Sequence, residues 1–282
     1  MTGQATCFGA GTIVNAIATG KGAAFGLALR ATATAVATPN GNGVVVHSSP
    51  GIDPDLAVGC AKHVLRRSRR KVALEVTIDS EIPVSRGLKS SSAVANAVVL
   101  ASARVLDVPL EPLQIINIGV DEALQARVTI TGAFDDACAS FFGGVVVTDN
   151  KARKLEKVDG LPADLLAALH IPRRMITKAS LRGIDFSSIR TQVDEAYRLA
   201  LQGDYLRALE VNSAAYAPLV GIDETPARRA RAAGALVAGV SGAGPAIVAL
   251  VRPARVDAVV RALEDGEAEV RVASLVPQTV GR

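Results

Sequence analysis

Hydrophobic and polar positions follow two different periods along the first half of the chain. In residues 72–79, Val72, Leu74, Val76 and Ile78 alternate with small or polar side chains, which is the period of a half-buried strand. Strand-like runs also cover 26–38 and 44–48, and apolar positions at helical spacing cover 56–68, 93–108 and 113–126. Residues 129–149 predict a loop, a short helix, a Gly-Gly break and a strand.

The pattern changes after the polar stretch 151–160. Helical spacing covers 187–202 and 204–215. The last fifty residues then read as ALVAGV, a turn SGAG, AIVALV, the helix PARVDAVVRALED and the strand EVRVASLV. Strand, turn, strand, helix and strand in this order are typical of an α+β layer. We therefore predict an α+β protein with two domains, 1–160 and 161–282.

Composition favours a globular protein of a reducing compartment. The 282 residues are 49% hydrophobic and 21% charged, which is enough apolar material for a large core. No apolar run of about 18 residues predicts a membrane span, and the first residues lack the features of a secretory signal. Cys7, Cys60 and Cys138 form no Cys-x-x-Cys pair, and the three histidines show no ligand spacing. We expect a cytoplasmic protein without a disulfide framework or a zinc site.

One basic run, RRSRRK at 66–71, raises the question of nucleic-acid binding. Aromatic residues make up only 3% of the chain and tryptophan is absent, so no stacking platform is predicted. The run lies where the helix 56–68 ends, and cations stabilise the C-terminal end of a helix dipole. We therefore predict no nucleic-acid partner, while the net charge of +4 suits a small anionic substrate.

The strongest chemical signal is PVSRGLKSSSA at 83–93, between an apolar strand and an apolar helix. The unpaired N–H groups of a first helical turn, its dipole and three serine hydroxyls together favour an anion. Lys89 adds a full positive charge. A serine N-cap explains one hydroxyl, but three serines, a lysine and Gly87 exceed what a cap requires. A triphosphate, with its many oxygens, is the ligand that this stretch predicts.

Two common phosphate-binding signatures are excluded. The only Gly-Lys pair, Gly20-Lys21, has Asn15 where a P-loop needs its first glycine. The stretches 9–14 and 242–247 both lack the last glycine of G-x-G-x-x-G. Neither a P-loop nor a Rossmann site is predicted.

The stretch 83–93 resembles the second motif of the GHMP kinases, Pro-x-x-x-Gly-Leu-Gly-Ser-Ser-Ala, which wraps the phosphates of ATP. Here Lys89 replaces the third glycine and one serine is added, which is similar to the archaeal-type shikimate kinase branch. GAGTIVNAIATGKGAAFGL (9–27) and TGAFDDACASFFGG (131–144) are similar to the same branch. VSGAGPAIVAL (240–250) matches the glycine-rich third motif, so the motifs follow the family order over nearly the whole chain.

This resemblance implies a two-lobed fold. The N-terminal lobe would be an α/β unit like domain 2 of ribosomal protein S5, and the C-terminal lobe a ferredoxin-like α+β unit. The implied activity is phosphorylation of the 3-hydroxyl of shikimate, in aromatic amino-acid (chorismate) biosynthesis, with ATP and Mg²⁺. The residues implied for ATP are Pro83, Val84, Ser85, Arg86, Gly87, Leu88, Lys89, Ser90, Ser91, Ser92, Ala93, Ser241, Gly242 and Gly244. Those implied for Mg²⁺ are Ser91, Ser92 and Glu122.

Two carboxylates are candidates for the catalytic base. In the mevalonate kinase branch of the family, one aspartate ahead of a Gly-Gly pair is the base toward the acceptor hydroxyl. Counting back from 143–144 favours Asp136, and counting forward from Gly132 favours Asp135. From the residues alone, capping of the helix that follows explains one of the two aspartates equally well. Both remain candidates.

The resemblance also implies cationic groups. Lys21 is placed beside the transferred phosphate, with Asn15 and Thr19 as further polar contacts. A bidentate arginine is the expected partner of the shikimate carboxylate. Arg86, Arg127, Arg182 and other arginines are candidates that the sequence does not separate.

Other functions on the same fold stay open. Homoserine kinase is the first alternative and mevalonate kinase the second. A decarboxylating relative and a non-catalytic ATP-binding module are further alternatives. Paired carboxylates argue against a pure binder, because they are unfavourable near a triphosphate unless a metal or an acceptor proton needs them. The sequence predicts no oligomeric state.

Overall fold

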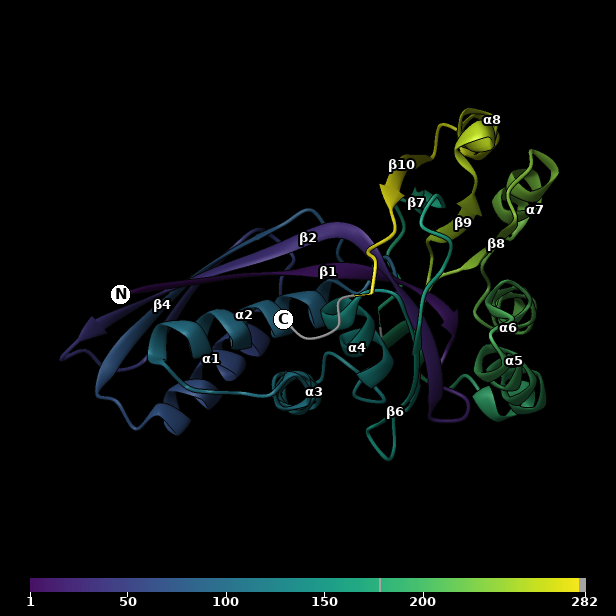
Figure 1. Ribbon diagram of the computed structural model, residues 1–282. Helices are drawn as coiled ribbons and strands as arrows, with labels where there is room; N and C mark the ends of the chain where they lie inside the picture. The colour runs from purple at the N-terminus through teal and green to yellow at the C-terminus, as the bar shows by residue number, and fades with distance from the viewer. Residues whose placement is uncertain (178, 279–282) are drawn as a thin grey trace.

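The computed structural model describes residues 1–177 and 179–278, and two β-sheets organise it (Figure 1). The first sheet has the order β3-β4-β2-β5-β6, with β1 paired to β2. Its strands are β1 (Thr2–Val14), β2 (Lys21–Pro39), β3 (Val44–Ser48), β4 (Val72–Ser80), β5 (Val145–Asp149) and β6 (Lys154–Asp159). Because β1 and β2 are antiparallel along nearly their whole length, the turn 15–20 lies at one end of the sheet.

Helices cover one face of this sheet (Figure 1). They are α1 (Pro54–Ser68), α2 (Ser90–Leu106), α3 (Pro112–Gln125) and α4 (Phe134–Phe142). α2 is rich in alanine and valine and is buried along most of its length. A Cβ atom on Gly3 would lie 2.5 Å from the carbonyl oxygen of Ala101, so glycine in β1 lets α2 lie close to the sheet.

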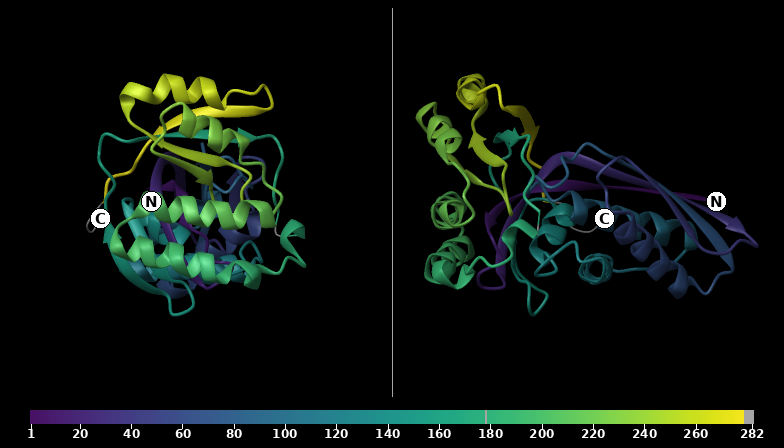
Figure 2. Two further views of the ribbon diagram at one scale, coloured as in Figure 1. Left: turned by 90° about the vertical axis from the view of Figure 1, so that its right-hand side faces the viewer. Right: turned by 180° about the vertical axis from the view of Figure 1, so that it is seen from behind.

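The second sheet has the antiparallel order β10-β7-β9-β8. Its strands are β7 (Leu166–Pro172), β8 (Val237–Val240), β9 (Ile247–Val251) and β10 (Ala268–Ser274). Its helices are α5 (Arg190–Gln202), α6 (Tyr205–Leu219), α7 (Thr225–Ala232) and α8 (Val256–Leu263), with short 3-10 turns η1 (Ala179–Leu181), η2 (Phe186–Ile189) and η3 (Pro253–Arg255). Figure 2 shows these four helices stacked on the side away from α1–α4.

The C-terminal segment ties the two lobes together. After β10 the chain returns to the first sheet, where Val276 donates to the carbonyl of Gly26 (3.0 Å) and accepts from the N–H of Gly144 (2.9 Å). A Cβ atom on Gly143 would overlap the carbonyl oxygen of Pro277. The Gly-Gly break after α4 is therefore where the returning backbone passes.

Most predicted elements are confirmed, and so is the α+β class. The predicted helices 56–68, 93–108 and 113–126 correspond to α1, α2 and α3. The strands β1, β6 and β7 and the helix α7 were not predicted. The C-terminal half of β1 is buried at every position, so its sequence lacks the polar alternation that marks a strand. The chain leaves the first sheet at Asp159 and enters the second at Leu166, and the domain boundary at 160/161 stays a prediction.

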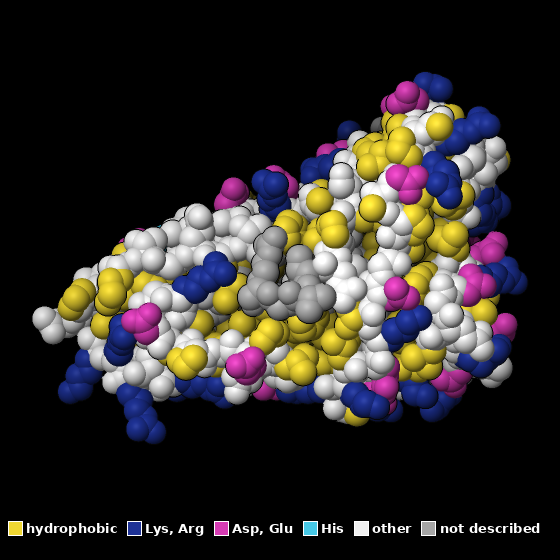
Figure 3. All heavy atoms as spheres, in the orientation of Figure 1, with side chains coloured by type: hydrophobic (Ala, Val, Ile, Leu, Met, Phe, Trp, Pro, Cys, Tyr) yellow, Lys and Arg dark blue, Asp and Glu magenta, His cyan; other side chains and the backbone are white. Residues whose placement is uncertain are grey.

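The structure also bears on the predictions about surface charge, membrane-spanning segments and cysteines. On the face that Figure 3 shows, basic and acidic side chains are interspersed rather than gathered into one basic surface. Within the described residues, no helix is both long and apolar enough to cross a bilayer. All three cysteines are buried, and none forms a disulfide.

Candidate active site

The main cavity has a volume of about 510 Å³ and is lined by residues of both lobes. The loop before α2, the first turns of α2 and α4, the segment 127–133 and the turn 242–244 all contribute. This volume lies in the range of sites for nucleotide-sized ligands. Segments that resemble the three family motifs thus meet around one space.

The loop before α2 has an unusual backbone that turns a helix end toward the cavity. Ser85, Gly87 and Lys89 have positive φ angles of 56°, 82° and 68°. α2 then begins at Ser90 without a side-chain cap, and Ser90, Ser91 and Ser92 line the cavity. The N–H groups of a first helical turn have no partner within the helix, so this end offers donors and positive potential to the cavity. Ala93 is buried behind it.

The turn of the third motif holds this loop in place. The hydroxyl of Ser241 donates to the carbonyl of Gly87 (2.8 Å) and accepts from the N–H of Thr12 (3.1 Å). The N–H of Gly242 donates to the Thr12 hydroxyl (2.8 Å), and the Asn15 amide donates to the carbonyl of Gly242 (2.8 Å). Ser241 is thus a buried anchor, while Gly242 and Gly244 line the cavity.

The Arg86 side chain stabilises the loop before α2 and does not line the cavity. Its guanidinium donates to the carbonyls of Pro172 (2.8 Å), Arg173 (2.7 Å) and Val84 (3.2 Å). These bonds fix the loop to the end of β7. A direct contact of the Arg86 side chain with a nucleotide or an acceptor carboxylate is therefore not supported by this geometry.

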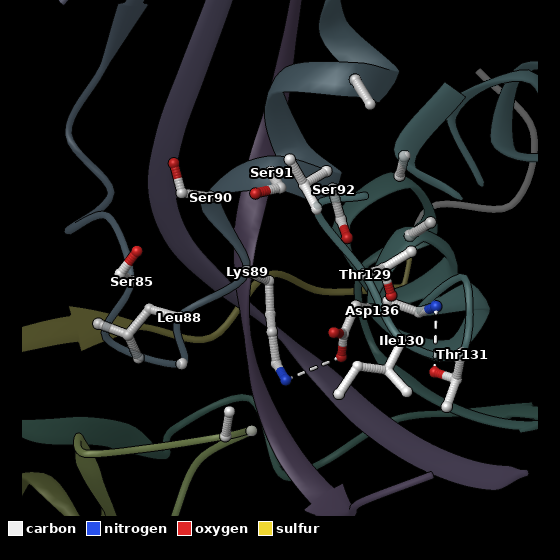
Figure 4. A pocket seen from close by; sticks show the side chains of 18 of the residues that line it. Ser85, Leu88, Lys89, Ser90, Ser91, Ser92, Thr129, Ile130, Thr131 and Asp136 are labelled. Carbon is white, nitrogen blue, oxygen red and sulfur yellow. Dashed lines mark hydrogen bonds and ion pairs between the residues drawn. The ribbon is translucent and has the colours of Figure 1, made fainter. Parts of the chain in front are cut away.

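The two predicted acids stand at the first turn of α4, and both line the cavity. Asp136 forms an ion pair with Lys89, with 2.9 Å between Oδ1 and Nζ (Figure 4). Both side chains are largely buried. In Figure 4 the Ser92 side chain, on the first turn of α2, points toward Asp136. The structure therefore brings the serine-rich turn, the lysine and the carboxylate together.

Asp135 is held by a polar network behind this pair. Its Oδ1 accepts from the amide of Asn150 (2.7 Å), whose own oxygen accepts from the Thr148 hydroxyl (2.7 Å). A Cβ atom on Gly22 would overlap the other carboxylate oxygen, so glycine is required there. Burial, reinforced by the charge of Asp136, raises the pKa of Asp135 to about 7, against the opposing effects of Lys89 and Asn150.

This pKa predicts a dependence of stability on pH. A carboxyl whose pKa is raised binds its proton more tightly in the folded state, so ionising it destabilises the fold as pH rises from about 4 to about 7. We expect Asp135→Asn to have nearly the melting temperature of the parent at about pH 4 or below and a higher one at pH 8. Calorimetry across this range checks it. A difference that is the same at every pH would contradict a raised pKa.

Two predicted side chains are not brought to the cavity. Lys21 does not line it, and its Nζ lies 5.3 Å from the centre of the Tyr197 ring. Glu122 is buried between α3 and α1, where it accepts from Nδ1 of His63 (2.9 Å). On α3, Gly119, Val120 and Ala123 line the cavity, whereas Glu122 faces α1, where a Cβ atom on Gly59 would lie 2.5 Å from its Oε2. The expectations that Lys21 touches the phosphate and Glu122 the metal lack geometric support.

A second, smaller cavity of about 300 Å³ adjoins the first at Ile17 and Thr131. Thr19, Asn150 and Lys151 also line it. Of the three arginines considered for the acceptor, only Arg127 lines the main cavity.

Several residues of the site were missed by sequence reasoning. Asn150 and Thr148 fix Asp135, and the buried Asn96 amide of α2 donates to the carbonyl of Ala137 (2.9 Å), which joins α2 to α4. A buried asparagine in the apolar pattern of α2 was a usable signal for Asn96. Asn150 follows a strand in a polar turn and carried no such signal.

Comparison with known families agrees with this geometry. Residues 55–144 match the GHMP kinases N terminal domain, and residues 225–268 match the GHMP kinases C terminal domain. The first match contains the loop 83–93 and both acids.

Curated relatives are similar over most of the chain. A protein of Methanosarcina acetivorans named shikimate kinase is 42% identical, and the alignment covers 90% of this chain and 86% of that protein. One of Pyrococcus furiosus with the same name is 40% identical, over 90% of this chain and 93% of that protein.

Solved structures show the same fold at lower identity. A homoserine kinase of Cytophaga hutchinsonii superposes with a TM-score of 0.78 at 19% identity, covering 98% of this chain and 96% of that one. The mevalonate kinase of Methanococcus jannaschii gives 0.79 at 15% identity, covering 97% and 98%. With both lobes, the motif order and relatives at about 40% identity in agreement, this chain belongs to the GHMP kinases.

Proposed function

We propose that this protein is a shikimate kinase, which transfers the γ-phosphoryl group of ATP to the 3-hydroxyl of shikimate. The observation that carries the proposal is the meeting of Lys89, Asp136 and the open end of α2 in one cavity. The relatives at about 40% identity that bear this name support the choice of acceptor. Buried cysteines without disulfides are compatible with the cytoplasm as its location.

The donor is proposed to lie in the main cavity with its phosphates at α2. The N–H groups of Ser90, Ser91 and Ser92 supply donors for the phosphate oxygens, and the helix dipole adds positive potential. The remainder of the cavity, lined by Ile52, Leu56 and the loop 83–88, is left for the nucleoside.

The oxygen donors on the cavity wall suit Mg²⁺. Within the described chain, no cluster of three histidine, cysteine or acidic side chains forms a metal cage. Mg²⁺ does not need one, since it takes most ligands from phosphates and water. We assign the hydroxyls of Ser91 and Ser92 as the protein groups that would hold it. When bound, it would neutralise phosphate charge.

Transfer then requires the acceptor hydroxyl beside Asp136. Asp136 accepts the hydroxyl proton as the acceptor oxygen bonds to the γ-phosphorus, and the bond from that phosphorus to the β–γ bridging oxygen breaks to release ADP. The second cavity adjoins this point, and Thr19, Thr131 and Asn150 offer hydrogen-bonding groups for a polyhydroxylated acid. Arg127 and Lys151 are the nearby cations for its carboxylate.

The test is turnover of the purified protein with ATP, Mg²⁺ and each acceptor in turn. We expect ADP release and a phosphorylated product with shikimate, at a kcat/KM at least about 100-fold above that with homoserine or mevalonate, because a site that pairs its polar groups with one substrate rejects others strongly. Phosphate on the 3-hydroxyl is checked by NMR of the product. Preferred phosphorylation of homoserine would refute the acceptor assignment.

A further inference from the structure

Lys89 has a backbone conformation that lysine normally avoids. Its φ and ψ angles of 68° and 31° lie in the left-handed region, where glycine is favoured. The family motif has glycine at this position. Lys89 also gives α2 no side-chain cap. The local backbone therefore gains nothing from a lysine, and a strained residue of this kind points to a role for its side chain.

The Lys89 side chain fills the corner where three segments meet. Only 7% of it is exposed, and its Nζ lies 2.9 Å from Oδ1 of Asp136. A Cβ atom on Gly242 would lie 2.5 Å from this same Nζ, so the ammonium lies directly against the turn of the third motif. Figure 4 shows the side chain reaching from the start of α2 toward Asp136.

The Lys89 ammonium has more N–H donors than its ion pair with Asp136 requires. A lysine carries three N–H donors, and Lys89 lines the same cavity as the open end of α2. A phosphate bound at α2 would bring negative oxygens to this ammonium. The Lys89 ammonium then contacts both the γ-phosphate that is transferred and the Asp136 carboxylate that takes the acceptor proton.

We propose that Lys89 is a catalytic residue that bridges Asp136 and the γ-phosphate of ATP. The proposal rests on the proposed kinase function. It adds a cation that contacts both the phosphate donor and the catalytic base. Lys89 stays protonated throughout: the acceptor proton goes to Asp136, the acceptor oxygen bonds to the γ-phosphorus, and ADP departs. Lys21, whose ammonium lies against Tyr197, is not this cation.

Three substitutions separate this role from a structural one. Lys89→Met removes the charge, Lys89→Gly restores the motif residue that suits the backbone, and Lys89→Arg keeps a charge. We expect Met and Gly to lower kcat by about 100-fold or more, as for the loss of one preorganised charge in other sites. Affinity for a non-hydrolysable ATP analogue should fall much less. Lys62→Met, an exposed lysine of α1, is the matched control and keeps normal turnover.

Rescue by a second cation supplies a further readout. We expect Lys89→Arg to recover part of the kcat that Lys89→Met loses, because it restores a positive charge beside Asp136. Full turnover by Lys89→Gly would overturn the proposal. So would a loss of analogue affinity with kcat unchanged, because Lys89 would then act only in binding.

One measurement decides the role of Lys89 even if no acceptor is phosphorylated. In the parent protein, the Nζ signal of Lys89 should shift when the ATP analogue is added. An unmoved Nζ signal with the analogue bound would overturn the bridge, whereas absent turnover alone would refute the proposed function.

Discussion

Asp136→Asn is expected to lower kcat by about 10³-fold or more while ATP affinity changes little. The carboxylate lines the cavity at the first turn of α4 and is paired with the buried Lys89. Asparagine keeps the shape of the side chain, but it cannot take the acceptor proton. General-base groups contribute on the order of 10²–10⁴-fold, and the loss of the charge beside Lys89 adds to this. Steady-state turnover and calorimetric titration of an ATP analogue measure the two quantities.

Two variants make this result specific. Asp164→Asn, an exposed aspartate that pairs with Arg252 in the second lobe, should keep parental turnover. Asp135→Asn keeps the hydrogen bond from Asn150 and should lose less activity than Asp136→Asn. If Asp135→Asn proved inactive and Asp136→Asn active, the base would be Asp135, and the raised pKa would be its catalytic feature.

Gly87→Ala is expected to impair both folding and nucleotide binding. Gly87 has a φ of 82°, and an added Cβ atom would overlap the backbone carbonyl oxygen of Ser241. The left-handed conformation alone costs an alanine about 1–2 kcal/mol. The overlap adds to it, since a backbone atom cannot move aside as a flexible side chain can. For a chain of this size we expect a melting temperature lower by roughly 4 °C or more.

Nucleotide binding should be weakened as well as stability in this variant. The hydroxyl of Ser241 fixes the loop through the carbonyl of Gly87, so a shift there moves the N–H groups of Ser90 to Ser92. We expect the affinity for an ATP analogue to fall by about tenfold or more, corresponding to about 1.4 kcal/mol. Gly160→Ala is the control, because an added Cβ atom there meets nothing within 4 Å. Unchanged affinity in Gly87→Ala would argue against phosphate binding at this loop.

The sequence determined the local structure and the kind of ligand. α1, α2 and β4 follow from hydrophobic spacing, because the period of burial is written directly in consecutive residues. The proposed anion site at the start of α2 also follows from local sequence, since a run of glycine, lysine and serines before an apolar helix indicates it without any distant partner. The fold and family followed from three motifs in order.

Only the tertiary structure decided which side chains meet. Lys89 and Asp136 are 47 positions apart in the sequence, and Asn150 reaches Asp135 from the end of a strand. Lys21 and Glu122 carry the right charges near the right motifs, but strand alternation and helical rotation turn them to other surfaces. Such contacts depend on how sheets and helices of both lobes pack, and the spacing of residues along the chain does not contain that information.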